Sequence, residues 1–174
     1  MNLHARCEKI CAVILDVDGV LTDGRIGYGA GSDEEIKFFH VRDGLGIALA
    51  RKCGMKVGIL SGRKSRANRR RAEELKLDFI EEGCRNKDEG LTLLLEKLAL
   101  TENECMYIGD DLIDAAPLKR CALGVVVGDG AAELDRVADY RTKAHGGQGA
   151  IREAIEMVLK EQGKWETVLR EYGI

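Results

Sequence analysis

The residues best suited to chemistry in this sequence are two aspartates in the segment DVDGVLTDG, residues 16–24. Asp16 and Asp18 directly follow the apolar run CAVIL, which is typical of a buried strand. Ligands bind where the strands of a doubly wound sheet end, and Gly19 permits a sharp turn of the chain there. Two carboxylates this close repel each other unless a cation or a shared proton lies between them. An Asp-Gly turn without chemical function produces the same pattern.

A second acidic segment, GDDLID at residues 109–114, also follows an apolar run. Asp110, Asp111 and Asp114 bring several carboxylates together, and unpaired negative charge at this density is costly without a divalent cation. Helix capping is the alternative, because Asp110 or Asp111 would suit the start of a helix at Leu112. We expect Asp110 to be a metal ligand, with Asp111 and Asp114 as ligands or helpers.

Two further polar residues stand where predicted strands give way to predicted helices. Ser61 follows the last apolar residue of the predicted strand in ILSGR (59–63). Its hydroxyl and the nearby backbone N–H groups could hold a phosphate. A Ser-Gly turn without function gives the same pattern. Lys87 follows Asn86 at a predicted helix start, where a cation opposes the helix dipole. A nearby anion would explain this placement, although an exposed lysine also tolerates it.

The elements that would position these residues alternate along the chain. Continuous apolar runs rich in branched residues predict buried strands, with weaker candidates at 77–80 and 139–142. The strong runs are 11–16, 56–60, 105–109 and 122–127. Leucines at helical spacing predict a helix over 91–98 with cap signals at Asn86 and Glu89, and a second helix is predicted over 151–159. This alternation predicts an α/β fold with a doubly wound, Rossmann-like parallel sheet.

Two segments lie outside this alternation. Residues 25–39 predict a β-hairpin insertion around Gly29-Ala30-Gly31-Ser32. Residues 163–174 carry the only tryptophan and predict a short helix and tail. The length of 174 residues favours one domain over the whole chain, 1–174.

Composition and charge exclude several classes of protein. No apolar stretch approaches the roughly 18 residues of a membrane span, and the first residues lack a signal-peptide pattern. The net charge of −3 argues against nucleic-acid binding. The 6 cysteines contain no CxxC pair, which indicates free thiols and a cytoplasmic protein.

The order of these signals, an aspartate pair, a serine, a lysine and an aspartate cluster, resembles the haloacid dehalogenase-like (HAD) phosphohydrolases over about residues 10–155. The resemblance implies that Asp16 is the nucleophile and that Asp18 is the general acid and base. It implies that Ser61 and Lys87 bind the transferring phosphoryl group. Mg²⁺ would be held by Asp16, the backbone carbonyl of Asp18, and Asp110. Only a helix and a short strand fit between Ser61 and Lys87, so no cap domain is expected.

Further segments narrow the resemblance. HVRDGLGI (40–47), SGR (61–63) and GGQGAIRE (146–153), together with the hairpin, resemble the family of 3-deoxy-D-manno-octulosonate 8-phosphate (KDO 8-phosphate) phosphatases. This resemblance implies a sugar-acid phosphate as substrate and a homotetramer in which hairpins associate and neighbouring subunits complete each site. The implied substrate-binding residues are Asp18, His40, Val41, Arg42, Asp43, Gly44, Arg63, Arg71 and Lys87.

Individual positions keep other readings open. His40 stands where the family usually has Asn, and Ala48 where many members carry a substrate-contacting Arg. A sister group acts on 2-keto-3-deoxynononate 9-phosphate and usually has Glu in place of Arg63, so Arg63 favours the octulosonate as substrate. The Arg63 guanidinium could pair with a sugar carboxylate through two hydrogen bonds. A broader sugar phosphatase is a further alternative. A non-catalytic oligomerisation module is disfavoured, because the four residues that catalysis would need are all present: Asp16, Asp18, Lys87 and Asp110.

Two polar segments have competing explanations. The basic run 63–71 predicts a solvated helix face with Arg69–Glu73 and Arg70–Glu74 pairs, or partial substrate contact. The segment 146–149 predicts either an anion-binding turn before a helix or a plain loop.

Overall fold

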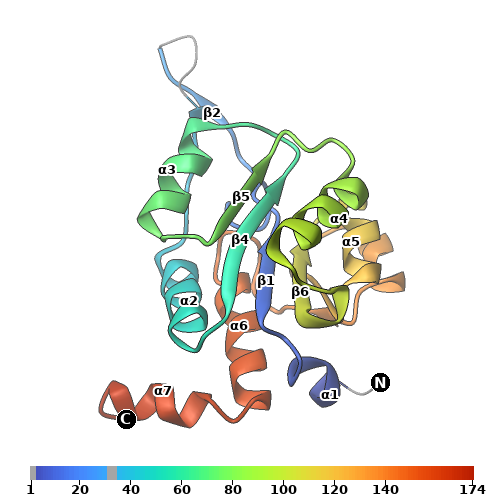
Figure 1. Ribbon diagram of the computed structural model, residues 1–174. Coiled ribbons are helices and arrows are strands. Elements are labelled where there is room, and N and C mark those ends of the chain that lie inside the picture. Colours follow the sequence, from blue (N-terminus) through green and yellow to red (C-terminus); the bar gives the residue numbers. More distant parts are fainter. Residues whose placement is uncertain (1–2, 31–34) are drawn as a thin grey trace.

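A six-stranded parallel sheet forms the centre of the computed structural model, which describes residues 3–30 and 35–174 (Figure 1). Its strand order is β5-β4-β1-β6-β7-β8. The strands are β1 (Ala12–Leu15), β4 (Lys56–Ser61), β5 (Phe79–Glu82), β6 (Cys105–Gly109), β7 (Leu123–Val126) and β8 (Tyr140–Arg141). The predicted α/β fold with a parallel sheet is therefore confirmed.

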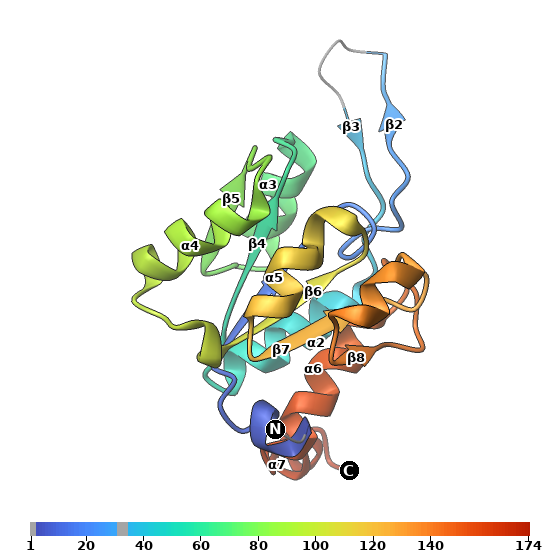
Figure 2. The same ribbon diagram turned by 90° about the vertical axis from the view of Figure 1, so that its right-hand side faces the viewer.

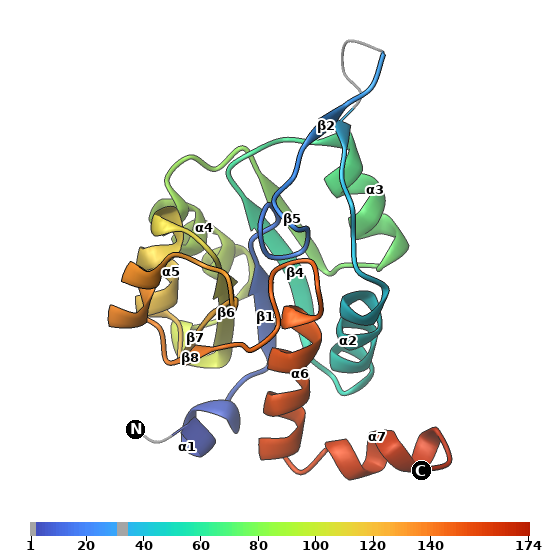
Figure 3. The ribbon, with the colours of Figure 1, turned by 180° about the vertical axis from the view of Figure 1, so that it is seen from behind.

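Helices cover both faces of this sheet. The α-helices are α1 (Leu3–Cys7), α2 (Val41–Lys52), α3 (Arg66–Glu74), α4 (Lys87–Leu98), α5 (Ala115–Arg120), α6 (Ala150–Glu161) and α7 (Trp165–Glu171). Short 3-10 helices are η1 (Glu102–Glu104), η2 (Leu112–Asp114) and η3 (Ala132–Arg136). One apolar core packs β1 against α2 and α6, and another packs it against α4 and α5 (Figures 1 and 3). Because both faces are covered, every residue of β1 is buried.

The direction of the chain across the sheet reverses at β1. Strands β4 and β5 extend from one side of it, and β6, β7 and β8 extend from the other. A crevice forms at the carboxyl ends of the strands where the order of a doubly wound sheet reverses, and ligands bind there. The residues that follow β1, β4 and β6 therefore converge at this point.

Strand β5 begins later than the predicted run 77–80. The backbone N–H of Leu77 donates to Ala72 at the end of α3, and Lys76 adopts a left-handed conformation with φ of 54°. These residues close the helix and are not available to the sheet. The strand consequently starts at Phe79.

The predicted hairpin projects from the body of the molecule (Figure 2). It consists of β2 (Gly27–Tyr28) paired antiparallel with β3 (Glu35–Ile36). Of its predicted turn, Gly31 and Ser32 lie outside the described residues. The C-terminal segment forms α7, as predicted, at the end of the molecule opposite the hairpin (Figure 1). Within residues 3–30 and 35–174, no helix combines the length and apolar character needed to cross a membrane.

Candidate active site

Three carboxylates meet in the crevice at the carboxyl end of the sheet. Oxygen atoms of Asp16, Asp110 and Asp114 all lie within 4.8 Å of one another. Asp16 follows β1, Asp110 follows β6, and these strands are neighbours in the sheet. Two sequence segments that are far apart along the chain thus supply one acidic cluster, which we define as Asp16, Asp110 and Asp114.

The cation beside this acidic cluster is Lys87. Its Nζ lies 2.8 Å from Oδ1 of Asp16 and 2.6 Å from Oδ1 of Asp114. Burial disfavours the charged ammonium, but the two carboxylates outweigh this effect and raise the pKa of Lys87. Asn86 caps α4 by accepting hydrogen bonds from the N–H groups of Asp88 and Glu89, as predicted. The anion that explains a lysine at this helix start is therefore the pair of aspartates.

Asp114 is fully buried, and both of its carboxylate oxygens have partners. The Tyr107 hydroxyl donates to Oδ1 over 2.5 Å, beside Lys87. The backbone N–H groups of Asp110 and Asp111 donate to Oδ2 at 3.0 and 3.3 Å. Asp114 is therefore bound mainly by the protein and is suited to orient Lys87 and the loop after β6. Tyr107 was not identified from the sequence. The available signal was its hydroxyl, a polar group in the middle of the apolar run at 105–109.

Asp111 has a separate and simpler role. It is exposed, and its Oδ1 accepts a 2.7 Å hydrogen bond from the N–H of Leu112 at the start of η2. The helix-capping alternative therefore holds for this residue.

The acidic cluster carries more negative charge than the protein compensates. Burial together with the charges of Asp16 and Asp114 raises the pKa of Asp110 to about 8, and burial raises the pKa of Asp16 to about 6 against the effect of Lys87. Oδ1 of Asp110 is buried and has no hydrogen-bond partner. Carboxylate oxygens are the ligands that Mg²⁺ prefers. A divalent cation bound by Asp16 and Asp110 would satisfy the orphaned oxygen and offset the excess charge.

Glycine is required where the loops of the site touch. Gly19 adopts φ of +94°, and a Cβ built on it would lie 2.1 Å from Oδ2 of Asp110. A Cβ on Gly146 would lie 1.7 Å from the carbonyl oxygen of Gly19. The loop at 146–149 therefore packs directly on the loop that carries Asp16 and Asp18.

Asp18 has different partners from Asp16. Its Oδ1 accepts a 2.5 Å hydrogen bond from Nζ of Lys37, whose side chain is fully buried. Lys37 also donates to Oδ1 of Asn68 on α3 over 3.1 Å. Lys37 and Asn68 were not identified from the sequence. A usable signal for Lys37 was its spacing from Glu35 in the predicted hairpin. Side chains two residues apart on a strand lie on the same side, so the two opposite charges could be expected close together.

Ser61 and Arg63 lie at the end of β4. Ser61 is buried, and its Oγ accepts a 3.3 Å hydrogen bond from the N–H of Arg63. The guanidinium of Arg63 forms an ion pair with Glu35 of the hairpin, and its Nε lies 3.8 Å from Oδ2 of Asp18. The half-exposed Arg63 therefore sits between the hairpin and the proposed acid and base.

Asp43 joins two helices. Its oxygens accept hydrogen bonds from the N–H groups of Gly149 and Arg152 at 3.0 and 2.8 Å, so the anion at the start of α6 is this buried carboxylate. The turn at residues 146–149 therefore does precede an anion-binding helix start, but the bound anion is a side chain of the protein itself. Nδ1 of His40 lies 3.8 Å from Oδ2 of Asp43. Substrate contact by Asp43 and His40 stays a prediction.

Gly44 and Arg71 lie next to each other between α2 and α3. A Cβ on Gly44 would meet a guanidinium nitrogen of Arg71 at 2.7 Å, and the same guanidinium lies over the Phe39 ring. Val41 is largely exposed. Ala48 lines a separate groove between the two helices.

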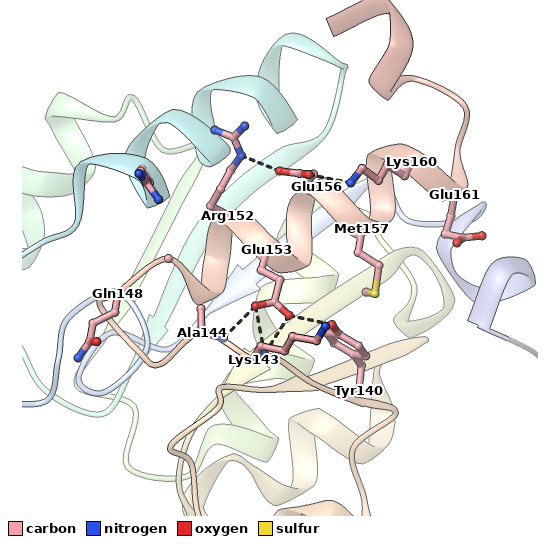
Figure 4. Close-up of a pocket in the computed structure, with 12 residues that line it drawn as sticks. Tyr140, Lys143, Ala144, Gln148, Arg152, Glu153, Glu156, Met157, Lys160 and Glu161 are labelled. Atoms are coloured by element: carbon pink, nitrogen blue, oxygen red, sulfur yellow. Dashed lines mark hydrogen bonds and ion pairs between the residues drawn. The ribbon is translucent and has the colours of Figure 1, made fainter. Parts of the chain in front are cut away.

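Arg42 is not brought to the acidic cluster. It lines a pocket of about 530 Å³ on the outer side of α6, with Tyr140, Lys143, Arg152 and Glu153 among the other lining residues (Figure 4). No member of the acidic cluster lines this pocket.

The basic run on α3 forms a helix face with ion pairs, though not all the predicted ones. Arg70 pairs with Glu74 over 3.4 Å, as expected. The predicted Arg69–Glu73 pair is wrong, because Nε of Arg69 lies 2.8 Å from Glu82 at the end of β5. Contact between α3 and the neighbouring strand decides this pairing.

Comparisons with known proteins agree with this arrangement. Residues 77–155 match the model of the haloacid dehalogenase-like hydrolase family. The chain is 42% identical over 163 residues to the 3-deoxy-D-manno-octulosonate 8-phosphate phosphatase of Escherichia coli, covering 94% of this chain and 86% of the relative.

Two solved structures are also similar. One is the Moraxella catarrhalis 3-deoxy-D-manno-octulosonate 8-phosphate phosphatase in complex with magnesium, phosphate and KDO, with a TM-score of 0.93, 36% identity and 97% coverage of both chains. The other is the cobalt-bound Haemophilus influenzae phosphatase, with a TM-score of 0.87, 39% identity, and coverage of 91% of this chain and 92% of that one.

Proposed function

The chain belongs to the family of KDO 8-phosphate phosphatases within the haloacid dehalogenase-like hydrolases, and we propose that it hydrolyses KDO 8-phosphate with Mg²⁺ as cofactor. The observation that carries this proposal is the convergence of Asp16, Asp110 and Lys87 at the carboxyl ends of β1 and β6. The Moraxella catarrhalis relative binds magnesium, phosphate and KDO, which supports both the cofactor and the sugar acid.

The first half of the proposed reaction transfers the phosphoryl group to Asp16. A carboxylate oxygen of Asp16 forms a bond to phosphorus while the bond from phosphorus to the sugar oxygen breaks. Asp18 donates a proton to that departing oxygen, which leaves as the alcohol. The product is an aspartyl phosphate, and the free sugar acid departs.

The second half regenerates the enzyme. Asp18, now ionised, accepts a proton from a water molecule as the water oxygen forms a bond to phosphorus. The bond between phosphorus and the Asp16 oxygen breaks, which releases inorganic phosphate and restores both carboxyl groups to their starting states.

Positive charge is needed because an anionic carboxylate must approach an anionic phosphate ester. Mg²⁺, when held by Asp16, Asp110 and the backbone carbonyl of Asp18, supplies charge that offsets this repulsion. Lys87 contributes a fixed ammonium within hydrogen-bond distance of Asp16. Ser61 is the last residue of β4, and its hydroxyl is proposed to donate a hydrogen bond to a phosphoryl oxygen.

Substrate selection and assembly are further parts of this proposal. Arg63 is half exposed beside Asp18, so its guanidinium is accessible to a sugar carboxylate, which would share it with Glu35. His40 and Arg71 are proposed to complete the binding site in a homotetramer formed through the hairpins. The exposed side chains of Tyr28 and Phe38 on the hairpin arms support such an interface. The 6 cysteines are all free, which suits the proposed cytoplasmic location.

The decisive experiment is a phosphate-release panel with KDO 8-phosphate, 2-keto-3-deoxynononate 9-phosphate and simple sugar phosphates, each with Mg²⁺ or with EDTA. We expect the highest kcat/KM for KDO 8-phosphate and no turnover in EDTA. Highest activity on the nononate, or equal activity on all esters, would favour the alternative substrates. A complete lack of turnover would favour a non-catalytic oligomerisation module.

A variant separates the proposed nucleophile from general damage to the fold. Asp16→Asn should abolish phosphate release while leaving the circular dichroism spectrum unchanged, because the amide fills the same space and cannot attack phosphorus. Asp23→Asn changes an aspartate of the same loop that pairs with Arg25 and is not a member of the acidic cluster, so it should retain activity. Substantial turnover by Asp16→Asn would reject the assignment.

A further inference from the structure

Lys37 is a buried cation in a position that needs an explanation. Its side chain has 0% exposure, and burying an ammonium is costly unless it is paired. Its hydrogen-bond acceptors come from two other parts of the chain: Oδ1 of Asp18 lies 2.5 Å from Nζ, and Oδ1 of Asn68 lies 3.1 Å away. Oε2 of Glu35, in the hairpin itself, lies 3.8 Å from Nζ. Lys37 thus connects the hairpin to the loop after β1 and to α3.

The backbone around Lys37 is held on both sides. Glu35 and Ile36, which precede it, pair with β2, and Phe39, which follows it, forms a bridge with Thr22 in the loop after β1. Asn68, its second partner, is buried on α3. The ammonium therefore projects from a fixed point of the backbone, and its position is determined before any substrate is present.

The consequence for Asp18 is a fixed carboxylate orientation. A charge-assisted hydrogen bond from Lys37 occupies Oδ1, while Oδ2 lies on the side of Arg63, whose Nε is 3.8 Å away. The Asp18 side chain is 20% exposed, whereas that of Lys37 is not exposed at all. Lys37 therefore acts on a substrate through the side chains that it contacts, and Asp18 is the nearest of these.

We propose that Lys37 is a positioning residue that directs Oδ2 of Asp18 toward the departing sugar oxygen, and that Asn68 holds Lys37 in place. This inference rests on the proposed phosphatase function. It assigns to the hairpin a role within its own subunit, in addition to the association of hairpins between subunits.

The proposed role of Lys37 predicts different effects on substrates with different leaving groups. The alkoxide of a sugar phosphate needs a proton from Asp18 to depart, whereas p-nitrophenolate is a stable anion that departs without one. The parameter kcat/KM reports the steps up to departure of the leaving group, so later hydrolysis of the aspartyl phosphate does not enter it. Loss of positioning should therefore lower kcat/KM for the sugar ester and spare the aryl ester.

The test compares Lys37→Met with the wild type on KDO 8-phosphate and p-nitrophenyl phosphate, with saturating Mg²⁺. We expect kcat/KM to fall on the order of 10²-fold for the sugar ester, the size of effect that misplacing a catalytic group produces, and to stay nearly unchanged for the aryl ester. Lys52→Met is the matched control, because Lys52 forms an exposed 2.5 Å ion pair with Glu171 far from Asp18. That variant should keep the wild-type ratio of the two values.

Equal losses on KDO 8-phosphate and p-nitrophenyl phosphate, or no loss on either, would overturn the inference. A loss on KDO 8-phosphate without a loss on a simple sugar phosphate would also overturn it, because that ester has the same kind of leaving group but lacks the carboxylate that Arg63 is proposed to bind. If Lys37→Met does not fold, Asn68→Ala decides: it keeps the ammonium and removes one anchor, so the ratio should shift in the same direction by a smaller factor. An unchanged ratio in Asn68→Ala would then overturn the inference. Absence of Mg²⁺-dependent turnover by the wild type would instead reject the proposed function.

Discussion

The ammonium nitrogen of Lys87 lies 2.6 Å from Oδ1 of Asp114, and both side chains are almost completely removed from solvent. The same oxygen of Asp114 accepts the hydroxyl of Tyr107. Asp114 therefore links the start of α4 to β6 beneath the proposed metal ligands, and it fixes Lys87 for contact with Asp16.

Replacing Asp114 should destabilise the protein. In Asp114→Asn the amide nitrogen would face either the Lys87 and Tyr107 donors or the backbone N–H groups of the loop, so one set of donors loses its acceptor. We expect a loss of about 3 kcal/mol in the free energy of unfolding, the lower end for breaking a buried ion pair, because Lys87 keeps Asp16. Urea unfolding monitored by circular dichroism measures this loss.

The control for this prediction is Asp111→Asn. Asp111 caps η2 from an exposed position, and Asn is an equally good capping residue. Its stability should match that of the wild type. Equal stability of Asp114→Asn and the wild type would show that the buried pair does not support the fold.

Metal binding should be measurable without any reaction. Mg²⁺ at a hundred times its Kd should raise the free energy of unfolding of the wild type by about 2.7 kcal/mol. Asp110→Asn should gain little from Mg²⁺, because it lacks a proposed ligand. In EDTA this variant should be at least as stable as the wild type, since it removes one of three mutually repelling carboxylates. Thermal unfolding in EDTA and in Mg²⁺ tests both statements.

Asp23→Asn serves as the control for the metal prediction, because Asp23 follows β1 in the same loop but pairs with Arg25 and not with the acidic cluster. It should retain the full stabilisation by Mg²⁺. An equal shift in Asp110→Asn and the wild type would remove Asp110 from the proposed ligand set.

Assembly should depend on the exposed apolar side chains of the hairpin. Phe38 is 61% exposed, and a carboxylate there could not be buried in an interface without a partner. We expect light scattering to give a mass near four chains for the wild type and a lower mass for Phe38→Glu. Leu93→Glu, the same kind of change on an exposed leucine of α4, should leave the mass unchanged. A wild-type monomer would contradict the proposed tetramer.

Stability should depend on pH through Glu153. Burial opposes ionisation of this carboxylate, but the backbone N–H groups of Lys143 and Ala144 and the Tyr140 hydroxyl outweigh burial and lower the pKa of Glu153 (Figure 4). Because the folded pKa is below the unfolded value of about 4.3, the ionised group stabilises the fold above that pH, and this contribution is lost as pH falls through the folded pKa.

Glu153→Gln should therefore be less stable than the wild type at pH 7, and the difference should shrink in the acidic range. Chemical unfolding at a series of pH values measures the gap. Glu166→Gln on the exposed side of α7 is the matched control and should follow the wild-type curve. A gap that stays constant down to the acidic range would contradict the role of the ionised carboxylate.

Local patterns in the sequence determined the α/β fold and the approximate place of the site. The apolar run at 105–109 coincides with β6, and Asn86 caps α4 as its side chain predicts. Carboxyl ends of parallel strands share one edge, so Asp16 and Asp110 could be expected near each other from strand order alone. These features depend on residues close together in the chain or on general rules of sheet topology.

Spacing within α3 predicted the Arg70–Glu74 pair, but only the tertiary structure decided which polar and charged side chains pair between elements. Tyr107 with Asp114, Lys37 with Asp18, and Arg69 with Glu82 each join side chains on different elements. Such pairs follow from how helices and the hairpin pack on the sheet, because a charge finds its partner in three dimensions and burial makes that choice costly to change. The spacing of residues along the chain does not determine these distances. The side chains that hold the site carboxylates in place were therefore identified only from the folded structure.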